Sequence, residues 1–264
     1  MLPFTKAHAY GNDFLYVVED ALAGRNPVPL AREMCDRHTG VGADGLIVYD
    51  VTPDGPVMRL FNADGSLAEV SGNGVRGLAA ILLRRNGTGG EVTVRTDAGP
   101  KHLVRTEGSG ARQTFRAAMG LPKDLVSESI SAGGETLRAA IMDFGNPQCV
   151  VLGTLPDHER FSRVGAALER HARFPHGTNV EFATVESRDV VRILIWERGV
   201  GPTQSSGTGS CASLVAAAAF GGADRQAQVV APGGAQRVEW LDDSVYLTGW
   251  AEIVFDGVWL RPPL

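Results

Sequence analysis

The sequence predicts an α+β protein made of two pseudo-symmetric halves, each a β-sheet wrapped around a central helix. Three observations lead to this fold class. A Ser-Gly-X-Gly motif followed by small and aliphatic residues occurs twice, at Ser71 and at Ser206. Short runs rich in Val, Ile, Leu and aromatic residues surround each motif, as is typical of strands. The 264 residues are enough for one large domain or for two of about 130 residues.

The two halves are predicted from a repeat along the chain. Four blocks recur with a spacing of 134 or 135 positions, which argues against chance. Two repeats of this length do not form a solenoid, whose units are shorter and more numerous. The paired blocks are Gly11-Asn12 with Gly145-Asn146, residues 42–47 with 177–182, 60–62 with 195–197, and 71–74 with 206–209.

The individual elements follow from apolar runs and their period. Runs of β-branched and aromatic residues predict short strands, and longer runs with apolar residues every three to four positions predict helices. The predicted strands are residues 14–18, 45–49, 57–61, 91–96, 102–105, 190–196, 228–230 and 244–247. The predicted helices are residues 30–37, 75–85, 161–171 and 211–220.

Composition excludes several classes of protein. The formal net charge is −5, so nothing favours a nucleic-acid partner. The three cysteines, Cys35, Cys149 and Cys211, are too few and too far apart for a disulfide framework or a metal site. The first residues form no apolar signal segment, and no apolar run is long enough to cross a bilayer. We therefore expect a cytoplasmic protein without a membrane partner.

The two serine motifs predict a site for a small anionic molecule. A Gly-X-Gly at a helix start leaves backbone N–H groups without partners, and the helix dipole adds positive potential. Neither motif has the pattern of a nucleotide-binding loop. Polar residues also recur where strands end, and amides with an Arg–Glu pair suit a zwitterion. An amino acid is the expected ligand. These polar residues are Asn12, Asn62, Asn146, Asn179, Glu197 and Arg198.

The same residues resemble the diaminopimelate epimerase family, within the superfamily that includes proline racemase. The resemblance runs nearly end to end, and its strength lies in the order and spacing of many short motifs. They include Gly11-Asn12-Asp13-Phe14, residues 42–45, residues 61–66, Gly72-Asn73-Gly74, Gly145-Asn146-Pro147, residues 177–182, residues 196–199 and Gly207-Thr208-Gly209.

The resemblance implies a fold, an activity and a set of site residues. The implied fold has two halves, residues 1–112 with about 252–264 and residues 113–251. The last strand returns to the first half, and a ligand cleft lies between the halves. The implied activity is cofactor-independent epimerisation of LL- to meso-diaminopimelate, a step of lysine and peptidoglycan precursor synthesis, and a homodimer is possible. The implied catalytic positions are Ser71 and Ser206. The implied substrate contacts are Asn12, Asn62, Gly72, Asn73, Asn146, Asn179, Glu197, Arg198, Gly207 and Thr208.

The chain departs from the family pattern around the chemistry. Ser71 and Ser206 stand where the family has catalytic cysteines, Gln148 where it has a histidine, and Pro202 where it has a glutamate. A thiol ionises far more readily than a hydroxyl, which normally needs an adjacent base. No spacing links a base such as His8 to either serine. A related isomerase or dehydratase, or an amino-acid-binding protein without turnover, therefore remains an alternative.

Overall fold

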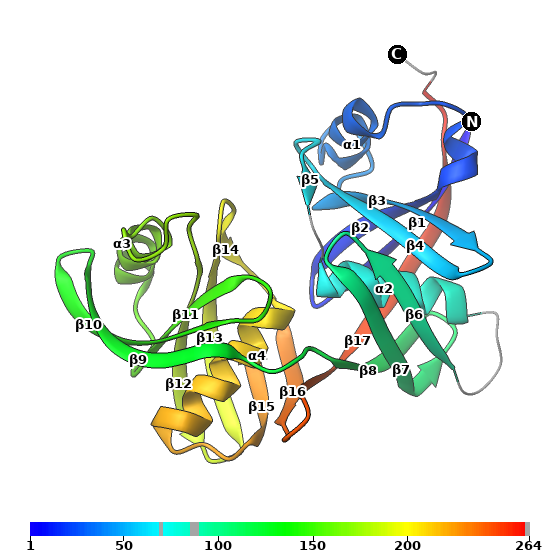
Figure 1. Ribbon diagram of the computed structural model, residues 1–264. Helices are drawn as coiled ribbons and strands as arrows, with labels where there is room; N and C mark the ends of the chain where they lie inside the picture. The colour runs from blue at the N-terminus through cyan, green and yellow to red at the C-terminus, as the bar shows by residue number, and fades with distance from the viewer. Residues whose placement is uncertain (69–70, 85–89, 262–264) are drawn as a thin grey trace. The chain divides into compact units, whose positions relative to one another are not determined.

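The computed structural model describes residues 1–68, 71–84 and 90–261, and in it the chain divides into two compact units (Figure 1). Unit 1 comprises Met1–Ala117 and Gly249–Leu264, and unit 2 comprises Ala118–Thr248. The sequence analysis places these boundaries near residues 112 and 252. The strand β17 (Val245–Trp259) explains why the end of the chain belongs to unit 1, because it first pairs with β16 (Gly234–Trp240) and then with β1 (Leu2–Ala9).

In the described residues, both units are built from strands with two α-helices each. In unit 1 these are β1, β2 (Asn12–Val18), β3 (Gly45–Thr52), β4 (Gly55–Asn62), β5 (Leu67–Ala68), β6 (Glu91–Thr96), β7 (Gly99–Ser109), β8 (Arg112–Ala118), α1 (Pro27–Cys35), α2 (Gly72–Leu83) and a 3₁₀ turn (Glu19–Leu22). In unit 2 they are β9 (Lys123–Ala132), β10 (Glu135–Asp143), β11 (Pro147–Leu152), β12 (Asn179–Ser187), β13 (Val190–Glu197), β14 (Gly201–Thr203), β15 (Gln226–Ala231), β16, α3 (His158–Glu169), α4 (Gly207–Ala216) and a π-helical turn (Ala217–Gly221).

The pairing of the strands confirms the repeat. In unit 1, β2 and β3 run parallel with Phe14 opposite Gly45, and in unit 2, β11 and β12 run parallel with Gln148 opposite Asn179. The next pairs, β3 with β4 and β12 with β13, are both antiparallel. The units therefore share one topology. The register corrects one predicted block by a single residue: Gly45 corresponds to Asn179, a spacing of 134, whereas the predicted block aligns 42–47 with 177–182 at a spacing of 135.

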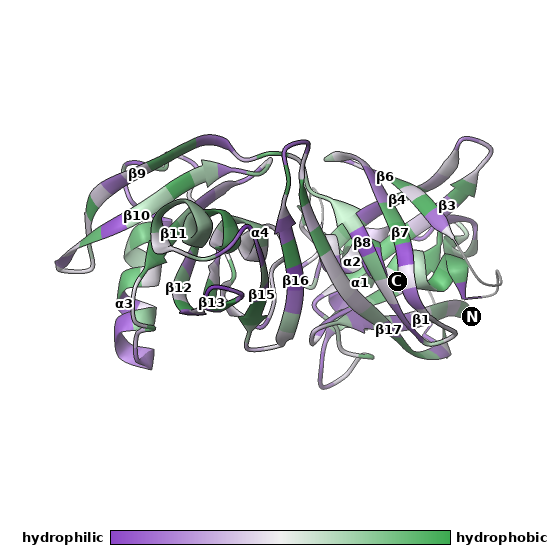
Figure 2. Cartoon of the chain, turned by 90° about the horizontal axis from the view of Figure 1, so that it is seen from below, coloured by the Kyte–Doolittle hydropathy of each residue, from purple (hydrophilic) through white to green (hydrophobic). Residues whose placement is uncertain are grey.

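A central helix inside each sheet confirms the predicted fold class. Figure 1 shows α2 enclosed by the strands of unit 1 and α4 enclosed by those of unit 2. Strand β2 contributes to two cores because its side chains alternate between faces. In β2, Phe14 and Tyr16 pack around α2, whereas Leu15 and Val17 pack toward α1 on the other face. The same alternation appears as hydrophilic and hydrophobic bands along β16 in Figure 2.

The four helices lie where the sequence predicts them but begin three or four residues earlier. The residues that precede the apolar period are proline-rich in α1, charged in α3 and glycine-rich in α2 and α4, so the period alone misses them. Helix α1 begins after Asn26, whose side chain accepts a hydrogen bond from Val28 N, and α3 begins after Asp157 in the same way. The predicted end of the second helix, Arg85, lies outside the described residues.

The predicted strands are found, but others are absent from the prediction: β1, β5, β8, β9, β10, β11, β12, β14 and β16. Most of these mix polar and apolar residues without a continuous apolar run. For instance, β9 buries Ile130 and Ala132 but otherwise carries exposed or half-buried residues. Their place in the sheet depends on pairing with distant partners, which the local sequence does not report.

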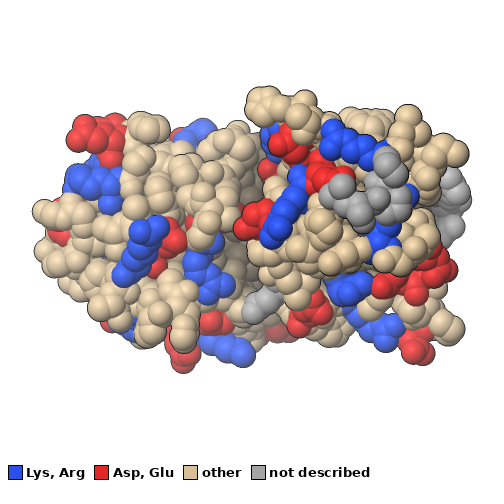
Figure 3. All heavy atoms as spheres, turned by 90° about the horizontal axis from the view of Figure 1, so that it is seen from above, with Lys and Arg blue, Asp and Glu red and all other residues tan. Residues whose placement is uncertain are grey.

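The surface shows no concentration of one charge on the face drawn in Figure 3, where Lys and Arg are interspersed with Asp and Glu. Within the described part of the chain, none of the helices has the length and apolar character that crossing a membrane would require. Among the described residues, no group of three or more His, Cys, Asp or Glu side chains is placed to hold a metal ion.

Candidate active site

The second serine motif forms the start of α4. Ser206 is the N-cap residue, with an extended backbone (φ −136°, ψ 130°), and its Oγ accepts a hydrogen bond from Gly209 N at 3.1 Å. The N–H groups of the first two helical residues, Gly207 and Thr208, have no acceptor within a helix. Because the helix dipole adds positive potential there, this turn favours a carboxylate or another anion.

The first serine motif forms the start of α2 with the same geometry. Ser71 is the N-cap residue (φ −124°, ψ 122°), and its Oγ accepts a hydrogen bond from Gly74 N at 3.2 Å. Gly72 and Asn73 supply the first two N–H groups, as Gly207 and Thr208 do in α4. The prediction that both motifs lie at helix starts is therefore confirmed, and the structure adds that the serines are the N-cap residues.

A chain of hydrogen bonds fixes the amides near the start of α2. The buried Arg76 donates to Asn73 Oδ1, and the Arg76 guanidinium lies 5.6 Å from the centre of the Tyr10 ring. Asn73 Nδ2 in turn donates to Asn12 Oδ1 at 3.2 Å. Asn12 Nδ2 donates to Asp44 Oδ2 at 2.7 Å. Asn12 and Asn73, both predicted site residues, are thus held in defined orientations beside Ser71.

Charged residues anchor this network to the sheet. Asp13 contacts Lys6 Nζ at 2.9 Å and Arg37 Nη2 at 2.8 Å, and Arg37 also contacts Asp44 at 2.8 Å. Burial alone would raise the pKa of Asp13, but its hydrogen bonds with Arg37 and Lys6 outweigh burial and lower that pKa. Asp13 therefore stays ionised and keeps Asp44 in reach of Asn12.

The remaining predicted residue of unit 1, Asn62, lies at the end of β4, where it pairs with Gly45. Its Nδ2 donates to Ser66 Oγ at 3.0 Å in the turn that follows, and the residue is exposed. Asn62 thus shares the sheet edge with Asn12. The side-chain contact with Ser66, together with the contacts of the Asn62 backbone to Gly65 and Ser66, holds the residue in its own turn.

In unit 2, a second amide group surrounds the start of α4. Asn146 Nδ2 donates to Thr208 Oγ1 at 3.4 Å, and Gln148 Nε2 donates both to Asn146 Oδ1 at 2.8 Å and to Thr208 Oγ1 at 3.1 Å. Gln148 is fully buried. The residue that departs from the family pattern is therefore part of the same network as two predicted site residues.

The Asn179 side chain ties the start of β12 to the turn after β13. Its Oδ1 accepts a hydrogen bond from Arg198 N at 3.0 Å, and its Nδ2 donates to Pro147 O at 3.4 Å. Arg198 Nη1 donates to His176 O at 3.3 Å. Glu197, at the end of β13, is half-buried. The structure thus gathers the predicted residues of unit 2 at one sheet edge beside Ser206.

Glu169 also fixes the conformation of the Arg198 turn. Its carboxylate accepts hydrogen bonds from Trp196 Nε1 at 2.7 Å and from Gly199 N at 2.9 Å. Burial would raise the pKa of Glu169, but these two hydrogen bonds lower it. An ionised Glu169 therefore fixes both neighbours of the Glu197–Arg198 pair.

His8 contacts Gly11 and Trp250, and these are not the contacts of a base that serves one of the serines. Its Nδ1 accepts a hydrogen bond from Gly11 N at 3.3 Å, and its ring packs edge-on against Trp250 at 5.3 Å. These contacts fix the turn that precedes Asn12. Cys211 is fully buried in the core around α4, as expected of a small apolar side chain.

Two residues near the helix starts are missing from the sequence prediction. Arg76 follows Asn73 by one helical turn, and the i, i+3 spacing is a signal for their contact. Glu181 lies in β12 between Val180 and Phe182, which both pack against α3. Strand alternation therefore places the Glu181 carboxyl on the opposite face, toward α4. A charged residue at an inward position is the signal that could have identified it.

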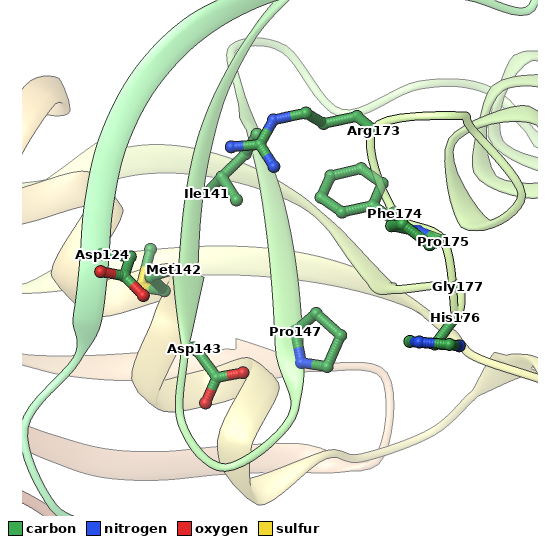
Figure 4. Close-up of a pocket in the computed structure, with 10 residues that line it drawn as sticks. All are labelled: Asp124, Ile141, Met142, Asp143, Pro147, Arg173, Phe174, Pro175, His176 and Gly177. Carbon is green, nitrogen blue, oxygen red and sulfur yellow. The ribbon is translucent and has the colours of Figure 1, made fainter.

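A pocket of about 360 Å³ lies beside this edge of unit 2 (Figure 4). Its lining includes Asp124, Asp143, Pro147, Arg173 and His176, and none of the predicted site residues. Pro147 directly follows the predicted residue Asn146, and Gly177 lies shortly before the predicted residue Asn179. The pocket therefore adjoins the candidate site without being part of it.

Chemically, each unit presents the same three features: a serine hydroxyl, two N–H groups of the first helical turn that have no acceptor within the helix, and oriented side-chain amides. The N–H groups suit a carboxylate, and amide and carboxylate oxygens suit an ammonium group. A hydroxyl beside a bound carboxylate lies where a proton on the neighbouring carbon could be exchanged. The arrangement therefore suits an α-amino acid and a reaction at its α-carbon.

Comparison with solved structures supports the fold. A predicted epimerase from Pseudomonas aeruginosa superposes with a TM-score of 0.76 at 14% identity, covering 99% of this chain and 100% of the other. A probable proline racemase from Agrobacterium radiobacter K84 gives 0.73 at 15% identity, with 100% and 94% covered. At such low identity these likenesses establish the architecture and no more.

Comparison of sequences identifies the family. The family described as diaminopimelate epimerase matches residues 4–122 and 140–254. A diaminopimelate epimerase of Desulforudis audaxviator is 41% identical over 98% of this chain and 100% of that protein. Diaminopimelate epimerase 1 of Nostoc sp. is 37% identical over 97% and 99%. With its repeated topology, its paired helix starts and this full-length match, the chain belongs to the diaminopimelate epimerase family.

Proposed function

We propose that the protein is an amino-acid epimerase that interconverts LL- and meso-diaminopimelate without a cofactor. The observation that carries the proposal is the pair of serine-capped helix starts at repeat-equivalent positions, in a chain that matches its relatives over nearly their whole length. A two-fold device of this kind suits an inversion, which needs one group to remove a proton and another to return one on the opposite face.

Both helix starts serve one substrate in this proposal. The N–H groups of Gly72 and Asn73, or of Gly207 and Thr208, bind the α-carboxylate, where the helix dipole also stabilises negative charge that develops as the proton leaves. Ser71 and Ser206 exchange the α-proton. The proposal extends to a cytoplasmic enzyme that acts on a small amino acid as a homodimer.

Amides and the Glu197–Arg198 pair position the substrate. Asn12 and Asn146 are oriented by their hydrogen bonds to Asp44 and Gln148, so each is preorganised before substrate binds. Asn62, Asn179, Glu197 and Arg198 complete the proposed contacts. Glu197 suits the ammonium group and Arg198 a carboxylate, since charge-assisted hydrogen bonds of this kind are the strongest available.

The serines favour a second candidate, a protein that binds the amino acid without turnover. A hydroxyl is a poor proton acceptor unless a base lies beside it. Incubation with the LL and meso isomers, followed by separation of the stereoisomers, decides between the two. Interconversion supports the epimerase, binding in calorimetry without interconversion supports the second candidate, and loss of water or ammonia indicates a lyase. Absence of binding by either isomer would refute both.

A further inference from the structure

Glu181 is a buried acid to which the proposed mechanism assigns no role. The side chain is 0% exposed, and both carboxyl oxygens lack a hydrogen-bond partner among the described residues. A buried polar group without a partner costs stability. A residue kept at such a cost calls for an explanation in terms of function.

The carboxyl lies directly under the first turn of α4. A Cβ placed on Gly209 would overlap Glu181 Oε1, and it would lie 3.1 Å from Ser206 Cβ. The carboxyl and the Ser206 side chain therefore border the same small space. Gly209 has to be a glycine because a larger residue would push the carboxyl away from this position.

The equivalent place in unit 1 is apolar. A Cβ placed on Gly74 would lie 2.8 Å from Ile47 Cδ1 and 3.5 Å from Ser71 Cβ. Ile47 and Glu181 thus occupy matching positions beneath matching helix starts. Because an isoleucine fills this place in unit 1, packing of the helix start does not by itself require a carboxyl.

The groups around Glu181 keep it protonated. Burial, and then the charge of Glu197 on β13, raise its pKa well above the ordinary value. On β11 and α4 the titratable groups are the thiols of Cys149 and Cys211, both buried. Arg192 on β13 pairs instead with Glu186, which lies at the far end of β12. Glu181 therefore enters the reaction carrying a proton.

We propose that Glu181 acts through Ser206: its carboxyl supplies a proton to Ser206 Oγ and takes one back from it. This inference rests on the proposed epimerase function. When Ser206 delivers a proton, its O–H bond breaks as the new Cα–H bond forms. The Glu181 carboxyl, which makes no hydrogen bond to Oγ in this structure, turns toward Oγ and gives it a proton, leaving a carboxylate. In the reverse direction, Oγ accepts the α-proton while its own proton returns to the carboxylate. Ser206 never has to exist as a free alkoxide, which removes the main objection to a serine here.

The decisive experiment is a double-mutant cycle on α-proton exchange. The rate of exchange of diaminopimelate in heavy water is measured by NMR for the native protein, Glu181→Gln, Ser206→Cys and the combined variant. A thiol is acidic enough to work without a partner, whereas a hydroxyl is not. Glu181→Gln should lower the rate by about 10²-fold with the native serine. Its effect in the Ser206→Cys background should be several times smaller.

The pH profile gives a second readout that a purely structural role would not move. Exchange by the native protein should rise with pH as Glu181 loses its proton and can accept one, and Glu181→Gln should remove this rise. Glu181→Ile, which copies the residue found in unit 1, controls for packing. It should fold with a circular dichroism spectrum like that of the native protein and show the same loss of exchange as Glu181→Gln.

The outcomes separate the inference from the function on which it rests. If the native protein exchanges the proton and Glu181→Gln keeps both rate and pH profile, Glu181 has no such role and the epimerase stands. If Glu181→Gln lowers the rate equally in both backgrounds at every pH, its role is structural and the inference is wrong. A native protein that binds diaminopimelate and exchanges no proton at all refutes the epimerase and the inference together.

Discussion

Replacing both serines by cysteine should raise the rate of α-proton exchange. In the variant with Ser71→Cys and Ser206→Cys, each sulfur takes the place of an Oγ that now accepts a hydrogen bond from Gly74 N or Gly209 N. A free thiol has a pKa of about 8.5, and a helix N-terminus lowers it. General acid–base groups contribute about 10²- to 10⁴-fold, so a gain in this range is expected.

The gain should be larger at one serine than at the other. Ser206 has Glu181 beside it, whereas Ser71 has Ile47. Ser71→Cys alone should therefore raise the exchange rate more than Ser206→Cys alone, although inversion should need both changes. Exchange is followed by NMR in heavy water, and inversion by separation of the stereoisomers.

A matched control separates chemistry from stability. Losing a serine N-cap costs about 1 kcal/mol. The variant with Ser71→Ala and Ser206→Ala loses both caps without gaining a thiol, so it should be destabilised and inactive. If the cysteine variant binds diaminopimelate but stays as inactive as the alanine variant, the serines are not what limits the reaction. Gln148, which occupies the family's histidine position, would then be the next residue to replace.

Three further outcomes are expected. Gly77→Ala should lower the free energy of unfolding by about 1–3 kcal/mol, because the new Cβ would overlap the buried Tyr16 hydroxyl, and Tyr16→Phe should recover part of this loss in thermal melts. Glu181→Gln should stabilise the protein, and increasingly so as pH rises above about 4.5. In the native protein the folded state keeps a proton on Glu181 that the unfolded state has lost, so the free energy of unfolding falls as pH rises. In urea titrations the difference between the variant and the native protein should therefore widen with pH. Arg198→Ala should weaken diaminopimelate binding in calorimetry by more than tenfold, since a charge-assisted hydrogen bond contributes about 1.5–3 kcal/mol.

The repeat and the helix starts could be predicted from sequence because their signals are local. A Ser-Gly-X-Gly before an apolar run needs no distant partner to define a capped helix, and both Ser71 and Ser206 take the expected N-cap geometry. The equal spacing of the blocks then places Asn12 and Asn146 at equivalent strand starts. The family resemblance extends the prediction to the residues at the strand ends.

The parts that could not be predicted depend on contacts between distant segments. Strands such as β9 and β10 lack a clear apolar alternation, and their pairing with each other defines them. In the sequence Glu181 is one residue of a strand motif, and only the packing of β12 against α4 shows where its carboxyl lies. The orientation of Asn73 likewise depends on Arg76 and Asn12, which come from a helix and a strand far apart in the chain.

The central claim is that the two serine-capped helix starts act on one α-carbon. The measurement that tests it most directly is the incubation of LL-diaminopimelate in heavy water with the native protein and with the single variants Ser71→Ala and Ser206→Ala. The native protein should form the meso isomer with deuterium at the inverted α-carbon, and neither variant should form it. Formation of the meso isomer by either variant at the native rate would contradict the claim, as would binding by the native protein without any incorporation of deuterium.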